Sequence, residues 1–216
     1  MSKELIFKSR HHAGQVLATK LTHFKNHPDT IVLGLPRGGI PVAFEVAKAL
    51  NIPLEVLVVR KLGVPGQEEL AMGAIASGGV KYLDDKIIQD LGITESEVNA
   101  VLERETKELL SREKRFHGEK KHRSLTNKTV IIVDDGLATG STMKAALAAL
   151  RTRNPSKIVI AVPTAPADTA REFGDLADEF ICLNIPYFFM GVGGSYEDFS
   201  QTTDDEVQSL LARDTH

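Results

Sequence analysis

The sequence predicts an α/β fold in which a mainly parallel sheet is flanked by helices. Short apolar runs alternate with helix-like segments, and the connections between them are short. The apolar runs are continuous, as in strands that helices cover on both faces. With 216 residues, of which 42% are hydrophobic, the chain can form one substantial core, so we expect a single domain over residues 1–216.

The spacing of apolar residues predicts the elements of the first half of the chain. Apolar residues at helical spacing indicate helices, and unbroken apolar runs indicate strands. Two such runs around Ser77, Gly78 and Gly79 predict a hairpin. In chain order, the predicted elements are a helix at 13–24, a strand at 31–35, a helix at 41–50, a strand at 54–59 and hairpin strands at 70–76 and 80–83.

The second half begins with a long amphipathic helix at 95–116, where many charges separate the apolar positions. The segment 185–194 is aromatic and rich in glycine and breaks the alternation of strands and helices. The other predicted elements are strands at 130–133, 157–162 and 180–183 and helices at 144–150, 168–176 and 204–212.

Composition excludes several classes of protein. The net charge of −3 gives no general attraction to nucleic acid or to an anionic membrane. The first ten residues lack the apolar core of a signal peptide, and no apolar run approaches the roughly 18 residues of a membrane span. We therefore expect a cytoplasmic protein with neither a membrane nor a nucleic acid as its partner. Cys182, the single cysteine, lies in an apolar run and is interpreted as a buried strand residue.

Residues 130–142, V-I-I-V-D-D-G-L-A-T-G-S-T, combine a buried strand, an acidic tip and a turn of small residues before a helix. Ligands of open α/β sheets bind beyond the carboxyl ends of such strands, and N–H groups at the start of a helix favour phosphate. Asp134 and Asp135 can accept hydrogen bonds from vicinal hydroxyls, so the motif predicts a sugar phosphate site. The alternative is a strand–helix turn with an acidic helix cap, which needs only one aspartate. The glycine spacing matches neither a Walker A loop nor a dinucleotide fingerprint.

This stretch resembles the 5-phosphoribosyl 1-diphosphate (PRPP) motif of the type I phosphoribosyltransferases. The resemblance implies that Asp134 and Asp135 bind the ribose and that the turn binds the 5′-phosphate. Gly136 departs from the family pattern, in which an aliphatic residue commonly follows the acidic pair. The turn residues assigned by the resemblance are Gly136, Ala138, Thr139, Gly140, Ser141 and Thr142.

The resemblance extends over most of the chain, to a bacterial group of predicted phosphoribosyltransferases whose acceptor is undefined. It implies a type I phosphoribosyltransferase-like core with a small C-terminal hood at about 184–203. Relative to compact purine-salvage members, residues at about 94–118 form a helical insertion, which would be a lid, a dimer surface or a simple insertion.

Two further segments fit a diphosphate site. Arg37, Gly38 and Gly39 follow a predicted strand, where backbone N–H groups and a guanidinium suit a diphosphate, and the family binds pyrophosphate in such a loop. Arg60 and Lys61 begin a charged, glycine-containing stretch that is similar to the mobile loop of orotate phosphoribosyltransferase, although the later lysine and histidine of that loop are missing. The alternatives are a turn that needs glycine for its conformation and a solvated loop entrance.

The hood is the expected acceptor site. Tyr187, Phe188 and Phe189 offer faces for stacking on a planar ring, although packing alone would explain two of these three residues. Related purine sites often use a lysine and an aromatic residue in or near the hood, and residues 184–199 contain neither lysine nor arginine. A hypoxanthine or guanine acceptor is therefore disfavoured.

The leading hypothesis is transfer of the 5-phosphoribosyl group from PRPP to a nitrogen acceptor, a nucleobase or related heterocycle, with release of pyrophosphate. Asp134, Asp135, Lys61 and Arg37 are the candidate catalytic residues. The expected cofactor is Mg2+, which Asp134 and Asp135 would hold mostly indirectly, through substrate and water. PRPP and a small-molecule acceptor are the expected partners, and a homodimer is compatible with the sequence.

Two alternatives stay open. One is a PRPP-sensing regulator without catalysis, which draws on the basic cluster of Arg112, Lys114, Arg115, Lys120, Lys121 and Arg123. Glu113 and Glu119 interrupt that cluster, so an exposed helix end explains it more simply. The other is a PRPP or ribose-phosphate hydrolase, in which water replaces the acceptor.

Overall fold

The computed structural model describes residues 5–116 and 122–213. The chain divides into two compact units. The parallel-sheet unit comprises Met1–Val56, Ser124–Gly140 and Pro155–His216, and the hairpin unit comprises Leu57–Arg123 and Ser141–Asn154. The predicted hood at 184–203 falls in the first of them, and the predicted insertion at 94–118 falls in the second.

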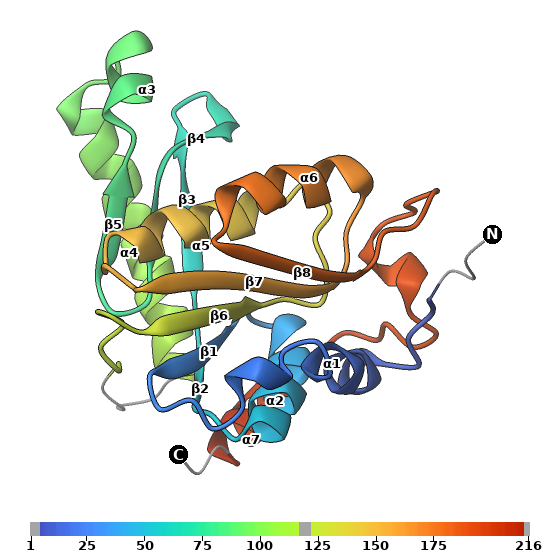
Figure 1. The fold of residues 1–216 in the computed structure, drawn as a ribbon. Helices are drawn as coiled ribbons and strands as arrows, with labels where there is room; N and C mark the ends of the chain where they lie inside the picture. The colour runs from blue at the N-terminus through green and yellow to red at the C-terminus, as the bar shows by residue number, and fades with distance from the viewer. Residues whose placement is uncertain (1–4, 117–121, 214–216) are drawn as a thin grey trace. The chain divides into compact units, whose positions relative to one another are not determined.

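A five-stranded parallel sheet forms the centre of the parallel-sheet unit, as predicted (Figure 1). Its strand order is β2–β1–β6–β7–β8, and each neighbouring pair is parallel. The order places β6, the strand that precedes the acidic pair, at the centre. The strands are β1 (Thr30–Gly34), β2 (Leu54–Val56), β6 (Thr129–Val133), β7 (Lys157–Thr164) and β8 (Glu179–Asn184).

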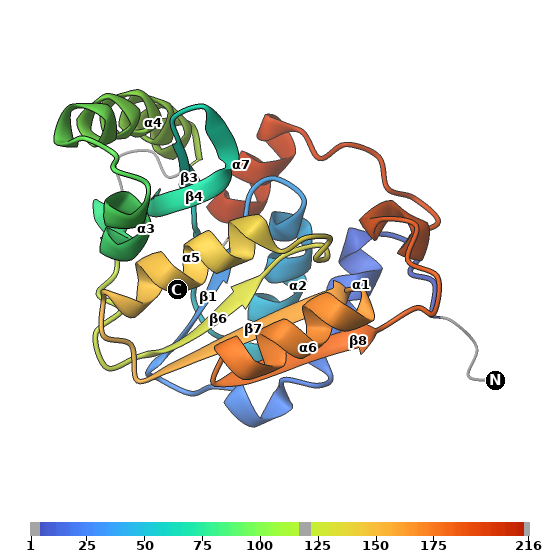
Figure 2. The same ribbon diagram turned by 90° about the horizontal axis from the view of Figure 1, so that it is seen from above.

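Helices of the same unit cover both faces of this sheet. The helices α1 (Arg10–Ala18) and α2 (Gly39–Leu50) lie on one face, and α6 (Ala167–Leu176) lies over β7 and β8 on the other (Figures 1 and 2). The final helix, α7 (Asp204–Ala212), contacts α2 and β2. Every residue of β1 is buried, which explains its unbroken apolar run.

The first predicted helix, at 13–24, was wrong in its bounds. Helix α1 starts at Arg10 because Ser9 caps it: the Ser9 hydroxyl accepts a hydrogen bond from the backbone N–H of His12. It stops at Ala18, and the Thr19 hydroxyl donates to the carbonyl of Val16 at 2.7 Å. A separate turn of 3-10 helix, η1, covers Thr22–Phe24. The apolar spacing continued through this break and concealed it.

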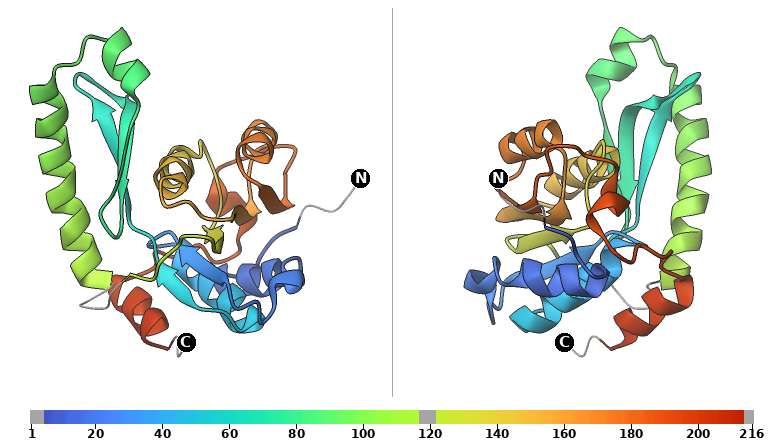
Figure 3. Two further views of the ribbon diagram at one scale, coloured as in Figure 1. Left: turned by 60° about the vertical axis from the view of Figure 1, so that its left-hand side comes forward. Right: turned by 90° about the vertical axis from the view of Figure 1, so that its right-hand side faces the viewer.

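Within its described residues, the hairpin unit contains a three-stranded antiparallel sheet, β3–β4–β5, and three helices. Helix α4 runs alongside the β3–β4 hairpin (Figure 3). The predictions of a hairpin at 70–76 and 80–83 and of a helix at 95–116 are confirmed. The elements are β3 (Val59–Val64), β4 (Gln67–Ala76), β5 (Val80–Leu83), α3 (Asp85–Asp90), α4 (Glu95–Phe116) and α5 (Ser141–Arg151).

Two predictions about residues 54–69 were wrong. The strand predicted at 54–59 ends at Val56, and Val59 begins another strand in a different sheet. Arg60 and Lys61 were expected at a strand end, at the start of a loop, but both lie inside β3. Pro65 and Gly66 form only the hairpin turn, where Gly66 adopts a left-handed φ of 77°. The prediction of a loop was wrong because the exposed, charged residues at the start of β4 have a composition typical of loops.

Cys182 lies on β8, as predicted, and is partly buried. Burial raises the pKa of its thiol to about 11. No helix within the described ranges is both long enough and apolar enough to span a bilayer.

Candidate functional site

Asp134 and Asp135 follow the last residue of β6, at the carboxyl end of the central strand. Both are partly buried. The Asp134 carboxylate accepts a hydrogen bond from the backbone N–H of Asp135, with 2.8 Å between Oδ1 and N. The Asp135 carboxylate forms an ion pair with Arg10, with 2.8 Å between Oδ2 and Nε. The two neighbouring carboxylates therefore point to different partners.

The loop after β1 lies directly against this acidic pair. A Cβ at Gly39 would lie 2.9 Å from Asp134 Oδ1 and 2.9 Å from the carbonyl oxygen of Val133. A Cβ at Gly38 would overlap the carboxylate of Asp135. Only glycine permits this approach, so the structure brings the predicted diphosphate loop and the predicted ribose carboxylates together.

Arg37, the charged residue of that loop, is exposed and faces α7. Its Nη1 lies 3.4 Å from Oδ1 of Asp204, and the two side chains are 40% and 30% exposed. An ion pair of this length and exposure contributes little to stability. Arg37 can therefore exchange Asp204 for an anionic ligand at low energetic cost.

Burial raises the pKa of both carboxylates of the acidic pair. For Asp134 the pKa lies well above the usual value, because burial disfavours the charge and the neighbouring Asp135 adds repulsion. For Asp135 burial also raises the pKa, and the hydrogen bond and charge of Arg10 oppose that rise. The pair therefore holds a proton more readily than two exposed aspartates would.

Contacts with the rest of the parallel-sheet unit support the turn after the acidic pair. A Cβ at Gly136 would lie 2.6 Å from a methyl carbon of Val192, in the C-terminal segment. This contact gives a physical reason for glycine where the family commonly has an aliphatic residue. Gly140 has a φ of 70° and lies against the ring of Phe173 on α6. Ala138 and Thr139 are exposed between these supports.

Sequence reasoning missed Arg10 and Tyr196, which both contact Asp135. The Tyr196 hydroxyl donates a hydrogen bond of 2.6 Å to the backbone carbonyl of Asp135. Arg10 comes from α1, 125 residues earlier in the chain, and Tyr196 comes from 61 residues later. Arg10 lies in none of the predicted motifs, and nothing in the sequence around Tyr196 indicated that its hydroxyl contacts Asp135.

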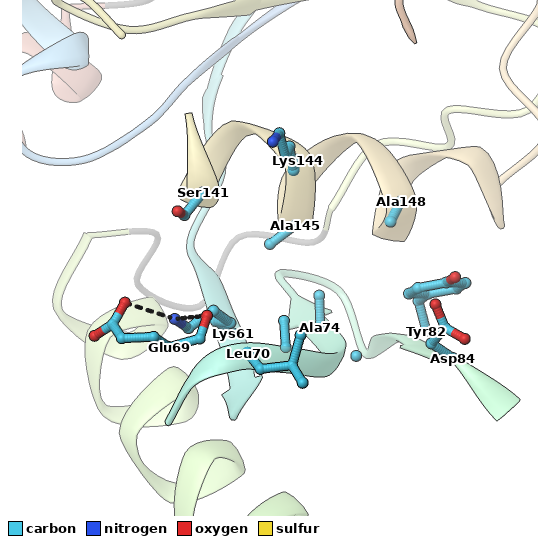
Figure 4. Close-up of a pocket in the computed structure, with 12 residues that line it drawn as sticks. Lys61, Glu69, Leu70, Ala74, Tyr82, Asp84, Ser141, Lys144, Ala145 and Ala148 are labelled. Carbon is cyan, nitrogen blue, oxygen red and sulfur yellow. Dashed lines mark hydrogen bonds and ion pairs between the residues drawn. The ribbon is translucent and has the colours of Figure 1, made fainter. Parts of the chain in front are cut away.

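The hairpin unit contains a pocket of about 430 Å³ between α5 and the hairpin strands (Figure 4). It joins Lys61 and Ser141, which the sequence assigned to the diphosphate and to the 5′-phosphate. Lys61 Nζ lies 3.1 Å from the carbonyl oxygen of Glu69 and 3.5 Å from Glu69 Oε2. The other lining residues are Leu70, Ala71, Gly73, Ala74, Tyr82, Asp84, Lys144, Ala145 and Ala148.

Arg60, the neighbour of Lys61, connects β3 to α4. Its Nε and Nη2 lie 2.8 Å and 2.5 Å from Oε2 of Glu105, whose side chain is 9% exposed. Arg104 also donates to Glu105. Because a buried carboxylate left unpaired would be costly, this contact fixes the hairpin to the long helix.

The aromatic residues expected to bind the acceptor lie in an exposed segment. Tyr187 is 88% exposed and Phe188 is 77% exposed, whereas Phe189 is partly buried. The rings of Tyr187 and Phe188 meet edge to face, with 4.7 Å between their centroids. The segment therefore presents aromatic surface that the parallel-sheet unit itself does not cover.

The structure describes only part of the basic cluster that would support a regulatory role. Lys120 and Lys121, together with the interrupting Glu119, lie outside the described residues. In the last turns of α4, Glu113 accepts a hydrogen bond from the backbone N–H of Gly78 and pairs with His122 at 2.9 Å. This end of α4 therefore contains acidic as well as basic side chains.

Comparisons with known proteins identify the family of the chain. The family model described as the phosphoribosyl transferase domain matches residues 2–198. Rv0571c of Mycobacterium tuberculosis (strain ATCC 25618 / H37Rv), whose name assigns it only provisionally to the phosphoribosyl transferases, is 46% identical over 208 residues. That match covers 96% of this chain but only 47% of Rv0571c, so the chain spans about half the length of this relative.

Two solved structures extend the comparison. The protein TT1426 from Thermus thermophilus is 35% identical and superposes with a TM-score of 0.89, over 98% of this chain and all of that chain. A hypoxanthine-guanine phosphoribosyltransferase from Bacillus anthracis shares the fold at 12% identity and a TM-score of 0.50, over 87% of this chain and 86% of that chain. Because the family model matches residues 2–198, nearly the whole chain, the chain belongs to the phosphoribosyl transferase domain family.

Proposed function

We propose that the chain transfers the 5-phosphoribosyl group of PRPP to a nitrogen acceptor, a nucleobase or related heterocycle, and releases pyrophosphate. The observation that carries this proposal is the contact between the acidic pair and the glycines of the loop after β1. It brings carboxylates suited to ribose hydroxyls against backbone suited to a diphosphate, as a PRPP molecule requires. Family membership supports the same donor.

The proposed reaction separates charge at the anomeric carbon. As the bond to the diphosphate breaks, positive charge develops on the ribose ring and negative charge on the leaving group. Asp134 and Asp135 orient the ribose and lie close to the positive charge, while Arg37 and Lys61 stabilise the departing diphosphate. Arg60 serves this site indirectly, because its contact with Glu105 fixes the strand that carries Lys61.

Carboxylate oxygens are ligands that suit Mg2+. Among the described residues, no group of three or more His, Cys, Asp or Glu side chains could hold a metal ion. The donor set therefore fits a cation held mostly by substrate oxygens and water, with Asp134 and Asp135 beside it. When bound, Mg2+ would neutralise negative charge on the diphosphate. Pairing with Arg10 leaves Asp135 as a hydroxyl acceptor rather than as a strong metal ligand.

The exposed aromatic segment is the proposed acceptor surface. Tyr187 and Phe188 would stack on a planar ring, and Phe189 would support them from its partly buried position. On this proposal, residues 184–203 act as a hood. The chain spans about half the length of Rv0571c, so the activity of a whole protein of that kind is itself part of the proposal.

Calorimetry with PRPP and Mg2+ tests the donor site. The double variant Asp134→Asn/Asp135→Asn replaces both proposed carboxylate acceptors by neutral amides, which are weaker acceptors, so we expect PRPP binding to be lost. Asp90→Asn/Asp175→Asn is the matched control, since it removes the same charge from two exposed positions and should bind PRPP normally. Normal binding by the first variant would refute the site assignment.

Pyrophosphate release separates the proposed enzyme from its alternatives. Release that depends on an added base supports the transferase. Steady release without any base would identify a hydrolase, and PRPP binding without release under either condition would favour a regulator. A thermal-shift screen of bases, with a PRPP analogue and Mg2+ present, selects the bases to try, because a bound acceptor raises the melting temperature.

A further inference from the structure

Arg10 is a cation that lies against the acidic pair, and two features fix the backbone around it. It is the first residue of α1, whose start the Ser9 cap determines. Just before it, the backbone of Phe7 pairs with the C-terminal segment: Phe7 N–H donates to Ser195, and Glu197 N–H donates to Phe7, each at 2.8 Å. The segment before α1 and residues 195–197 therefore meet beside Arg10.

The guanidinium of Arg10 makes three different kinds of contact. Nε pairs with Oδ2 of Asp135 at 2.8 Å, and Nη1 donates to the carbonyl of Ser200 at 2.6 Å. Its central carbon lies 3.9 Å from the centroid of the Phe199 ring. A planar guanidinium can satisfy an in-plane carboxylate, an in-plane carbonyl and a ring face at once, whereas a lysine ammonium cannot.

These contacts confine the Asp135 carboxylate from two sides. Gly38 approaches it so closely that no Cβ fits, and Arg10 Nε itself lies 3.1 Å from the position of that missing Cβ. The Tyr196 hydroxyl holds the backbone carbonyl of the same aspartate. The Arg10 and Asp135 side chains are 11% and 15% exposed, so little water competes for their contact.

We propose that Arg10 is a positioning residue that orients Asp135 toward the ribose hydroxyls and ties it to the C-terminal segment through Phe199 and Ser200. This inference rests on the proposed function, because it assumes that Asp135 binds ribose. It also supplies a cation that the sequence of the hood lacks: Arg10 brings positive charge from the N-terminal helix to residues 199–200.

The test measures hydroxyl preference rather than affinity alone. Calorimetry compares ribose 5-phosphate with its 2-deoxy and 3-deoxy analogues, each of which lacks one hydroxyl. We expect the wild-type chain to prefer ribose 5-phosphate by about tenfold over the analogue that lacks the hydroxyl bound by Asp135, since that analogue loses a hydrogen bond to a charged acceptor.

Arg10→Gln should lower that preference roughly fivefold, because the sugar hydroxyl and Arg10 act through the same carboxylate. Arg10→Lys keeps the charge but loses the planar contacts, so its preference for ribose 5-phosphate should lie between those of the wild-type chain and Arg10→Gln. Phe199→Leu should give a smaller loss in the same direction. The control Arg171→Gln removes an exposed charge on α6 and should keep the wild-type preference. A general loosening of the fold would weaken binding of all three sugars equally.

The outcomes separate this inference from the proposed function. If the wild-type chain prefers ribose and Arg10→Gln keeps that preference over both analogues, the role of Arg10 is refuted and the donor site stands. If the wild-type chain binds no ribose 5-phosphate, or binds all three sugars equally, the ribose role of the acidic pair fails, and the inference fails with it. Should Arg10→Gln not fold, an unchanged preference in Arg10→Lys would refute the proposal.

Discussion

The acidic pair and the aromatic segment belong to the same parallel-sheet unit but differ in how firmly they are held. Asp135 is enclosed by a glycine loop, an arginine and a tyrosine hydroxyl, whereas Tyr187 and Phe188 are 88% and 77% exposed. Rigid surroundings preorganise a site before its ligand binds, whereas exposed aromatic rings gain packing contacts only when a ligand binds them. The proposed donor site is thus built in advance, and the proposed acceptor site has to be completed on binding.

The largest effect should come from filling the space between the glycine loop and the acidic pair. Gly38→Ala places a methyl group on the Asp135 carboxylate, so PRPP affinity should fall about a hundredfold through misplacement of that carboxylate. The same overlap should lower the free energy of unfolding by about 1–3 kcal/mol. Calorimetry and chemical denaturation measure the two effects.

Gly174→Ala is the matched control for that substitution. Gly174 lies on α6, and an added Cβ there would meet nothing within 4 Å. Alanine should therefore stabilise the helix by about 0.5–1 kcal/mol and leave PRPP binding unchanged. If Gly38→Ala behaved like Gly174→Ala, the donor site would not be preorganised as described.

A second prediction concerns Lys61, which lies in the pocket of the hairpin unit. Lys61→Gln should lower the rate of pyrophosphate release about thirtyfold, because a fixed charge on the leaving group is lost. Stability should change by less than about 0.5 kcal/mol, since its partner Glu69 is fully exposed. Lys107→Gln on α4 removes an exposed lysine and should retain full activity. Equal rates for the two variants would exclude Lys61 from the reaction.

The acidic pair should also make stability depend on pH. Burial raises the pKa of Asp134 above its unfolded value of about 3.8, so the folded chain binds more protons than the unfolded chain between those two values. The free energy of unfolding should therefore fall as the pH rises through that window, by at most about 1.4 kcal/mol per pH unit for one group. Denaturation at a series of pH values measures the slope.

Asp134→Asn removes this proton uptake, so its stability should vary less with pH over the same window. Asp175→Asn changes an exposed aspartate and should keep the wild-type slope. An unchanged slope in Asp134→Asn would mean that the folded structure does not hold a proton on this side chain.

The smallest effects on folding should come from the acceptor segment. Tyr187→Ala and Phe188→Ala should each change the free energy of unfolding by less than about 0.5 kcal/mol, as expected for exposed side chains. PRPP affinity should be unchanged, while the KM for the acceptor rises about tenfold with the loss of a stacking face. Leu110→Ala, at an exposed apolar position of α4, should alter neither quantity. A loss of PRPP affinity in either aromatic variant would erase the distinction between the two sites.

Much of the fold followed from local patterns. The long helix Glu95–Phe116 and the last helix Asp204–Ala212 have the bounds that apolar spacing predicted. The unbroken runs in β1 and β6 gave the parallel sheet and the position of the acidic pair. Local patterns were sufficient for these strands because a strand that is buried on both faces is apolar at nearly every position.

The missed features depend on contacts between distant residues. Residues 60–69, which form most of β3, the turn and the start of β4, were predicted as a loop, because Gly63, Gly66 and the charged start of β4 resemble a loop when considered alone. Arg10 was missed because its ion pair joins residues 125 positions apart. The sequence also did not predict that Lys61 and Ser141 line one pocket. They do so because helix α5 packs on the hairpin strands, and neither segment alone indicates this packing.

Cys182 gives this protein a practical advantage for spectroscopy. It is the single cysteine of the chain, and burial on β8 raises its pKa to about 11, so little thiolate is present near neutral pH. A cysteine introduced at the exposed position of Tyr187 should therefore react with a maleimide dye far faster than the native thiol. The wild-type sequence can serve as the labelling background without removal of Cys182, and fluorescence from position 187 would report directly on ordering of the acceptor segment.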